Sequence, residues 1–157
     1  MHNLDIIQEI VVKFTKSNIT LAVAESCTGG YISNMITNIP GASKVFERGI
    51  VCYSNLSKST LLNVDSDDIV KHGAVSEIVA KQLANNIRAI SNVTIGIGIT
   101  GIAGPTGGTP EKPVGLVYIG FSTQKETIVE KHQFNVGRIE FKRKVLEKVL
   151  SLLQNVS

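Results

Sequence analysis

The stretch from Ile19 to Ile36 reads ITLAVAESCTGGYISNMI and contains the transition that decides the fold. Its first six residues, 19–24, are apolar and partly β-branched, which predicts a buried strand. The polar, glycine-rich segment Glu25-Ser26-Cys27-Thr28-Gly29-Gly30 follows at once. Apolar residues then return to helical spacing, at Ile32, Met35, Ile36 and Ile39. The stretch therefore predicts a strand, a tight loop and a helix, the unit from which α/β domains are built.

The rest of the chain continues this alternation. Helical spacing is present around residues 7–14, and Ser76 is predicted to cap a further helix. Other helices are predicted at 55–62 and 138–153, and an acidic run at 65–68 is interpreted as a solvated helix start. Further strands are predicted at 46–53, 93–99, 114–121 and 127–134, the last two forming a hairpin. The order α-β-α-β-α-β-β-β-α predicts one layered α/β domain with a mixed sheet.

The composition is that of an ordinary globular domain. Hydrophobic residues make up 43% and charged residues 18% of the 157 residues, which suits one domain and excludes intrinsic disorder. A net charge of +3 is too small to indicate nucleic acid or a membrane surface, and aromatic residues, at 5%, are too few for a base-stacking sheet. Cys27 and Cys52 cannot build a disulfide framework, and the acidic N-terminus is unlike a secretory signal, so we expect a cytoplasmic protein.

A candidate nucleophile follows the first strand. Ser26 would lie at the edge of the sheet, where open α/β sheets bind ligands, and the N–H groups of the next helix could hold an oxyanion or a phosphate. Cys27, Thr28, Gly29 and Gly30 complete the loop, and the two glycines would let a ligand approach the backbone. Plain helix capping explains the same residues equally well. Cys27 is the rival nucleophile, since a thiol at a helix N-terminus has a lowered pKa, although a small buried side chain is an equal alternative.

The histidines do not offer an evident base for Ser26. His2 is terminal, His72 precedes a turn glycine and His132 falls in a hairpin strand, so no Ser-His-Asp triad is indicated. The alternative is a Ser–Lys pair, in which a desolvated lysine takes the proton. Lys58 would lie near the end of the second strand, although a solvated surface lysine is the more ordinary interpretation of that position.

Two further patterns bear on cofactors. The segment Gly96-Ile97-Gly98-Ile99-Thr100-Gly101 matches GxGxxG, but its glycines fall inside a predicted strand and no helix follows, so we reject a dinucleotide site. Residues 100–108 are interpreted either as a strand end opening into a backbone-rich binding loop or as a flexible connector. No spacing typical of metal ligands occurs in the sequence, and we expect neither a metal nor a cofactor.

Five motifs, taken together and in order, resemble a known family. They are Ala24-Glu25-Ser26-Cys27-Thr28-Gly29-Gly30, Tyr53-Ser54-Asn55 with Lys58, His72-Gly73-Ala74-Val75-Ser76, Thr100-Gly101-Ile102-Ala103-Gly104-Pro105 and Glu111-Lys112-Pro113-Val114-Gly115. They cover nearly the whole chain and closely resemble the CinA C-terminal domain family, the nicotinamide-nucleotide amidases. The resemblance implies a single three-layer α/β/α domain over residues 1–157. It looks like the stand-alone amidase form, because longer family members carry an additional N-terminal domain that is similar to molybdopterin-binding domains.

The resemblance also implies a reaction. The carboxamide of nicotinamide mononucleotide is hydrolysed to nicotinate mononucleotide and ammonia, a step in pyridine-nucleotide recycling. Ser26 would be the nucleophile, Lys58 the general base and Tyr53 its assistant. We expect substrate contacts from Cys27, Thr28, Gly29, Gly30, Thr100, Gly101, Gly104 and Arg138. The chain departs from the family pattern at Leu56-Ser57 and in the approach to Arg138, Phe134-Asn135-Val136-Gly137, while the spacing of the lysine and the arginine itself are kept.

Arg138 has a separate argument from its position. It lies in line with the apolar stripe of the last predicted helix, at the N-terminus, where the helix dipole disfavours a cation. An anion ligand would explain that position, and an arginine lying over the core with its head in water is the alternative. Two other functions stay open at this point, a non-catalytic nucleotide-binding module and an amidase for another small amide. We also expect a homo-oligomer, with a homodimer favoured.

Overall fold

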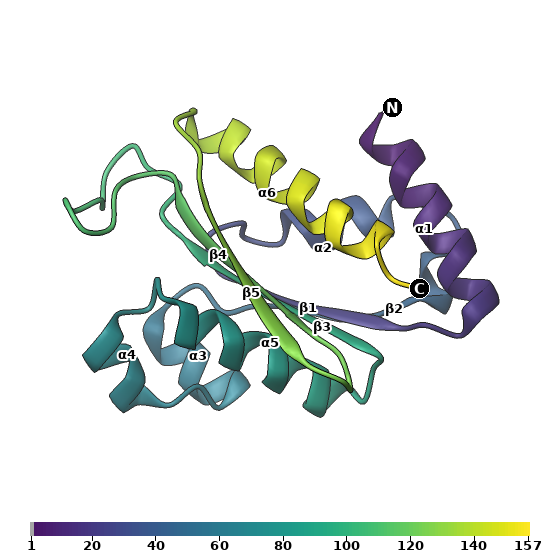
Figure 1. Cartoon of the computed structure of the whole chain (residues 1–157), viewed down its shortest axis with the longest axis horizontal. Coiled ribbons are helices and arrows are strands. Elements are labelled where there is room, and N and C mark those ends of the chain that lie inside the picture. Colours follow the sequence, from purple (N-terminus) through teal and green to yellow (C-terminus); the bar gives the residue numbers. More distant parts are fainter. Residues whose placement is uncertain (1) are drawn as a thin grey trace.

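The computed structural model describes residues 2–157 as a five-stranded sheet with helices on both faces (Figure 1). The elements in chain order are α1 (Asn3–Ser17), β1 (Leu21–Glu25), α2 (Tyr31–Thr37), η1 (Ala42–Lys44), β2 (Phe46–Val51), α3 (Asn55–Leu62), α4 (Ser66–His72), α5 (Glu77–Ser91), β3 (Ile95–Gly101), β4 (Leu116–Ser122), β5 (Thr127–Gln133) and α6 (Arg138–Gln154). The single α/β domain with a mixed sheet that the sequence predicts is confirmed.

The sheet has the strand order β2-β1-β3-β4-β5. The central strand β1 runs parallel to both neighbours, with Val23 opposite Gly49 of β2 and opposite Ile97 of β3. The remaining pairs, β3–β4 and β4–β5, are antiparallel, and the last two strands form the predicted hairpin. All five residues of β1 are buried, which agrees with the apolar residues 21–24 and extends the burial to Glu25.

Each face of the sheet carries its own apolar core. Helices α1, α2 and α6 cover one face, where Phe14, Ile32 and Phe141 are fully buried. Helices α3, α4 and α5 cover the other face, where Leu62 and Leu83 are fully buried (Figure 1). The three-layer α/β/α arrangement follows from these two cores, because each helix buries one apolar stripe against the sheet.

The glycines of β3 bring α5 directly onto the sheet. A Cβ added to Gly96 would lie 2.2 Å from the carbonyl oxygen of Ala84, and one added to Gly98 would lie 2.5 Å from the Ala84 nitrogen. A Cβ added to Gly120 of β4 would likewise lie 2.4 Å from the carbonyl oxygen of Ala80. The GxGxxG match therefore serves helix–sheet packing, and our rejection of it as a dinucleotide site agrees with its place inside β3.

Several predicted boundaries need correction. The strand predicted at 46–53 ends at Val51. The Cys52 N–H still donates to the carbonyl of Glu25 in β1 (2.9 Å), but the carbonyl groups of Cys52 and Tyr53 accept from Lys58. The strands predicted at 93–99 and 114–121 each begin two residues later, and their register pairs Gly101 with Val117. The predicted order has one helix between the second and third strands, where the structure has three, α3, α4 and α5. The N-cap of α4, Asp65, begins the acidic run interpreted as a helix start.

The topology creates a crevice at the carboxyl ends of β1 and β2. The chain leaves β1 into α2 on one face, whereas it leaves the neighbouring β2 into α3 on the other face. Open α/β sheets bind ligands where adjacent strands send the chain to opposite faces. Ser26 follows β1 and Tyr53 follows β2, so the two predicted site segments meet at this point.

Candidate active site

Ser26 lies directly after the carboxyl end of β1 and is the first residue of the candidate site along the chain. Its backbone N–H donates to the carbonyl of Ile99 in β3 (3.1 Å), which fixes the residue to the sheet as the chain turns into the loop. The residue is buried, and it lines a cavity of about 250 Å³. The cavity is lined by Ser26, Cys27, Tyr53, Asn55, Lys58, Ala74, Val75, Thr100, Gly101, Ile102, Ala103, Gly104, Thr106, Gly107 and Arg138.

Glu25, the residue before Ser26, caps α2 from inside the protein. One carboxylate oxygen accepts from the Thr28 hydroxyl (2.6 Å) and the Ile32 N–H (3.0 Å). The other accepts from the Ser33 N–H (2.9 Å) and the Ser33 hydroxyl (2.7 Å). Free N–H groups were expected at this helix start, and for Ile32 and Ser33 that expectation is wrong because they donate to the buried carboxylate of Glu25.

Thr28, Gly29 and Gly30 are not brought to the cavity. The Thr28 hydroxyl is bound to Glu25, and Gly30 is the N-cap of α2. Both glycines have positive φ angles, +60° and +98°, so they serve the turn from β1 into the helix. Of the loop residues predicted to contact substrate, only Cys27 lines the cavity.

The Cys27 thiol is not an activated nucleophile. Burial raises its pKa to about 12, and the negative charge of nearby Glu25 acts in the same direction. Of the two interpretations of Cys27, these features agree with a small buried side chain and not with a thiol of lowered pKa, because the loop places the sulfur in the core and Glu25 caps α2. Cys52 is also a free, buried thiol, and desolvation raises its pKa as well.

Lys58 is buried, with 1% of its surface exposed, which corrects its interpretation as a solvated lysine. Side chains in a helix point back toward its N-terminus, so Lys58 reaches under the first turn of α3 to the end of β2. Its Nζ donates to the carbonyl groups of Cys52 (3.0 Å), Tyr53 (3.1 Å) and Ser54 (3.4 Å). Within residues 2–157 no carboxylate forms a salt bridge with Lys58, and desolvation lowers its pKa from the ordinary 10.5.

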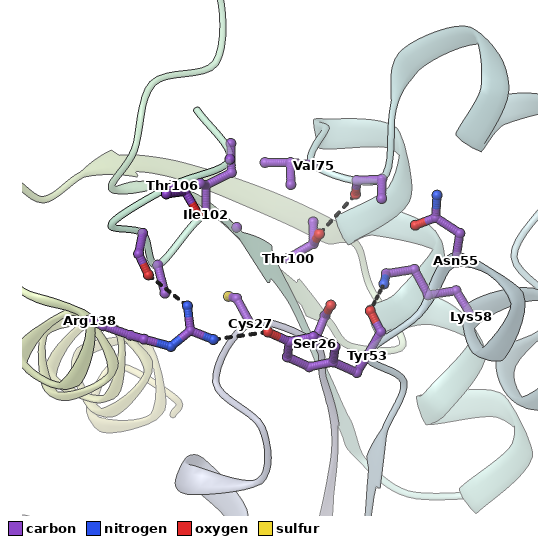
Figure 2. Close-up of a pocket in the computed structure, with 15 residues that line it drawn as sticks. Ser26, Cys27, Tyr53, Asn55, Lys58, Val75, Thr100, Ile102, Thr106 and Arg138 are labelled. Carbon is purple, nitrogen blue, oxygen red and sulfur yellow. Dashed lines mark hydrogen bonds between the residues drawn. The ribbon is translucent and has the colours of Figure 1, made fainter. Parts of the chain in front are cut away.

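Arg138 closes the opposite side of the cavity (Figure 2). It is the first residue of α6, as predicted, in line by spacing with the buried Phe141 and Val145, and its own side chain is exposed. Its guanidinium donates to the carbonyl of Gly104 (2.7 Å) and to the hydroxyl of Tyr53 (3.0 Å). These bonds use two of the five N–H groups of a guanidinium, so Arg138 keeps donors for an anion.

The end of β3 and the loop that follows it line one side of the cavity. The Thr100 hydroxyl donates to the carbonyl of Ala74 (2.8 Å) and thereby holds the α4–α5 connection over the site. Gly104 has a φ of +79°, and a Cβ there would lie 2.3 Å from a methyl group of Val114, so the loop requires glycine at this position. Thr100, Gly101 and Gly104 all line the cavity, which agrees with the interpretation of this segment as a binding loop.

Sequence reasoning missed part of the lining. The missed residues are Asn55, Ala74, Val75, Ile102, Ala103, Thr106 and Gly107. Six of them lie inside or directly after motifs that carried the family resemblance, and this position in the sequence could have identified them. In the part of the chain that the structure describes, no three His, Cys, Asp or Glu side chains are grouped as a metal site. None of the helices in residues 2–157 is both long and apolar enough to cross a membrane.

Comparison with known proteins places the chain in a family. A family model described as the CinA C-terminal domain matches residues 3–157. A CinA-like protein of Kosmotoga olearia is 49% identical over 133 residues, which is 84% of this chain and 32% of that protein. The chain spans about a third of the length of the curated relatives that it matches first.

Solved structures agree with this match. The crystal structure of the competence/damage inducible protein CihA from Agrobacterium tumefaciens has a TM-score of 0.93 at 33% identity, covering 98% of this chain and 94% of that one. The CinA superfamily protein from Enterobacter cloacae has a TM-score of 0.94 at 25% identity, covering 100% of this chain and 94% of that one. The chain therefore belongs to the CinA C-terminal domain family.

Proposed function

We propose that this chain is an amidase that hydrolyses the carboxamide of nicotinamide mononucleotide. The observation that carries the proposal is the burial of Lys58 in the same cavity as Ser26, without a carboxylate partner. The carbonyl groups that bind Lys58 supply no counter-charge, and desolvation lowers its pKa, which favours the neutral amine. A neutral amine beside a buried serine is the arrangement that a Ser–Lys hydrolase uses.

The reaction proceeds through an acyl-enzyme. The Lys58 amine takes the Ser26 proton while the Ser26 oxygen attacks the carboxamide carbon, giving a tetrahedral oxyanion. Lys58 then passes the proton to the departing nitrogen, the C–N bond breaks and ammonia leaves. Water, deprotonated by Lys58, attacks the ester, and the C–O bond to Ser26 breaks. Ser26 regains a proton from Lys58, and the carboxylic acid product is released as nicotinate mononucleotide.

The N–H of Cys27 is the donor that we assign to the oxyanion. Within residues 2–157 this N–H makes no hydrogen bond to another residue, and Cys27 lines the cavity next to Ser26. The Ile32 and Ser33 N–H groups of α2 are bound by Glu25 and cannot serve. A backbone donor next to the nucleophile is the usual form of an oxyanion site.

The charges of the lining favour an anionic substrate. Lys58 and Arg138 are its basic residues, and no residue among those that line it in the described chain is acidic. Arg138 at the mouth would bind the phosphate of the nucleotide, with the amide group at Ser26. At about 250 Å³, the cavity is smaller than the 300–1,000 Å³ that is typical of small-molecule sites, so it would enclose only part of the nucleotide.

One observation favours a second candidate function, nucleotide binding without catalysis. Within residues 2–157, Ser26 and Lys58 make no hydrogen bond to each other, and Lys58 is directed to backbone carbonyl groups. Catalytic hydrogen bonds often tighten only when substrate is bound, so this geometry is compatible with both functions.

Ammonia release from a panel of amides, with and without phosphate, separates these functions and tests the substrate. A nucleotide-binding module releases no ammonia, and an amidase for another small amide prefers a member without phosphate. A homodimer and a cytoplasmic location remain predictions, to be tested by sedimentation velocity and by fractionation of cells.

A further inference from the structure

Tyr53 joins the two ends of the cavity. Its backbone carbonyl accepts a hydrogen bond from Lys58 Nζ (3.1 Å), and its hydroxyl accepts one from Arg138 Nη2 (3.0 Å). One residue thus connects the candidate base to the candidate anion-binding arginine. Figure 2 shows the Tyr53 side chain extending toward the guanidinium of Arg138, which its hydroxyl contacts. The Tyr53 hydroxyl thus contacts Arg138, and Lys58 contacts the backbone of the same residue.

The ring of Tyr53 is open to the cavity. The residue is 59% exposed although both of its ends are held by hydrogen bonds. Among the lining residues of the described chain, Tyr53 is the only aromatic one, and none is acidic. A planar, positively charged ring entering this cavity would therefore find no carboxylate and a single aromatic face to stack on. Such a face attracts a cation through its quadrupole.

We propose that the Tyr53 ring is the platform on which the charged pyridinium ring of the substrate stacks, and that it selects aromatic carboxamides carrying a positive ring. This inference rests on the proposed amidase function. It assigns the tyrosine hydroxyl to holding the platform through Arg138 and not to proton transfer. The substrate then runs along the ring, with its amide at Ser26 and its phosphate at Arg138.

The test compares a charged and a neutral ring. Nicotinamide mononucleotide carries a pyridinium ring, and the 5′-phosphate of benzamide riboside presents the same carboxamide on an uncharged ring of the same shape. Dissociation constants for both are measured by calorimetry on Ser26→Ala, which prevents turnover, with Tyr53→Phe or Tyr53→Leu added. Because Tyr53 is exposed, neither change should prevent folding, and the melting temperature checks this.

Tyr53→Phe should keep the preference for the charged nucleotide, since the aromatic face remains. Tyr53→Leu should weaken binding of nicotinamide mononucleotide by about 3- to 30-fold while changing the neutral nucleotide much less. Equal weakening of the binding of both nucleotides by Tyr53→Leu would overturn the platform. Equal dissociation constants for nicotinamide mononucleotide in the Tyr53→Phe and Tyr53→Leu proteins would overturn it as well. If Ser26→Ala binds neither nucleotide and the wild type releases no ammonia, the proposed function itself fails, and the platform with it.

Discussion

Ser33 donates two hydrogen bonds to Glu25, from its N–H (2.9 Å) and from its hydroxyl (2.7 Å), to the same carboxylate oxygen. Glu25 is fully buried and directly precedes Ser26, so this contact fastens the first turn of α2 to the end of β1. The negative charge also offsets the positive end of the helix dipole from within the protein. An incoming anion must therefore be held elsewhere, and Arg138 is the cation at the mouth of the cavity.

Removal of the Glu25 carboxylate should destabilise the domain. Glu25→Ala leaves the buried N–H groups of Ile32 and Ser33 without their acceptor, and each such group costs about 1–3 kcal/mol. For a chain of this size we expect the melting temperature to fall by roughly 4 °C or more, measured by calorimetry. Glu47→Ala, which removes an exposed ion pair with Arg48, is the control and should leave it unchanged. A melting temperature for Glu25→Ala equal to that of the control would contradict this assignment.

The fold could be predicted from the sequence because its signals are local. The apolar run of β1, the N-cap Ser76 and the hairpin after residue 113 depend on neighbours in sequence, and all three are confirmed. The end of β2 could not be predicted in the same way. The carbonyl groups of Cys52 and Tyr53 bind Lys58 instead of continuing the strand, and that contact exists only once α3 has packed against β2.

Lys58 should be essential as a base and not as a charge. Lys58→Arg keeps the positive charge but cannot deprotonate near neutral pH, so it should lose at least about 100-fold in kcat, as should Lys58→Met. The exposed Lys71→Met is the matched control and should retain full turnover. Substantial activity in Lys58→Arg would show that the lysine acts only through its charge.

The lowered pKa of Lys58 gives the pH dependence a definite sign. The neutral base accumulates as pH rises, so kcat/KM should increase with pH through the Lys58 pKa. Stability should change in the same direction. The unfolded chain holds the Lys58 proton more tightly, so unfolding free energy rises with pH between the lowered pKa and the ordinary 10.5. Denaturant titrations should show a weaker rise across this window in Lys58→Met, and an unchanged rise would contradict the assignment.

Cys27 should be dispensable as a thiol. With a pKa of about 12, thiol exceeds thiolate by about 10⁴-fold at pH 8, so iodoacetamide should inactivate the protein only slowly. Cys27→Ala keeps the backbone N–H assigned to the oxyanion and should retain most of the activity. Rapid inactivation that disappears in Cys27→Ala would make the cysteine, and not Ser26, the nucleophile.

Arg138 should act on the phosphate. Arg138→Ala removes a charge-assisted contact worth about 1.5–3 kcal/mol, so KM for nicotinamide mononucleotide should rise by roughly 10- to 100-fold. Slow turnover of the phosphate-free riboside should hardly change. Arg143→Ala is the control on the same helix, because Arg143 is exposed and pairs with Glu140. Equal losses on nucleotide and riboside would mean that Arg138 supports the fold or the chemistry instead.

The parts of the candidate site that could be predicted are those where a sequence motif falls at the end of a strand or in the helix that follows it. Ser26 follows β1, and Lys58 lies in α3, the helix that follows the adjacent parallel strand β2, so the fold brings both to one cavity. The role of Glu25 could not be predicted, since a glutamate in a loop motif gives no sign of burial, and its four hydrogen bonds are visible only in three dimensions. The exposure of Arg138 could not be predicted either, since it depends on where α6 begins relative to the cavity.

The most direct test of the Ser26 assignment is ammonia release from nicotinamide mononucleotide, with nicotinate mononucleotide followed in the same samples. The wild type and Ser43→Ala, which changes an exposed serine outside the cavity, should release both products in equal amounts. Ser26→Ala should be folded, because Gly30 and Glu25 cap α2 without the Ser26 hydroxyl, and it should release essentially none. Activity near that of the wild type in a folded Ser26→Ala protein would contradict the serine mechanism.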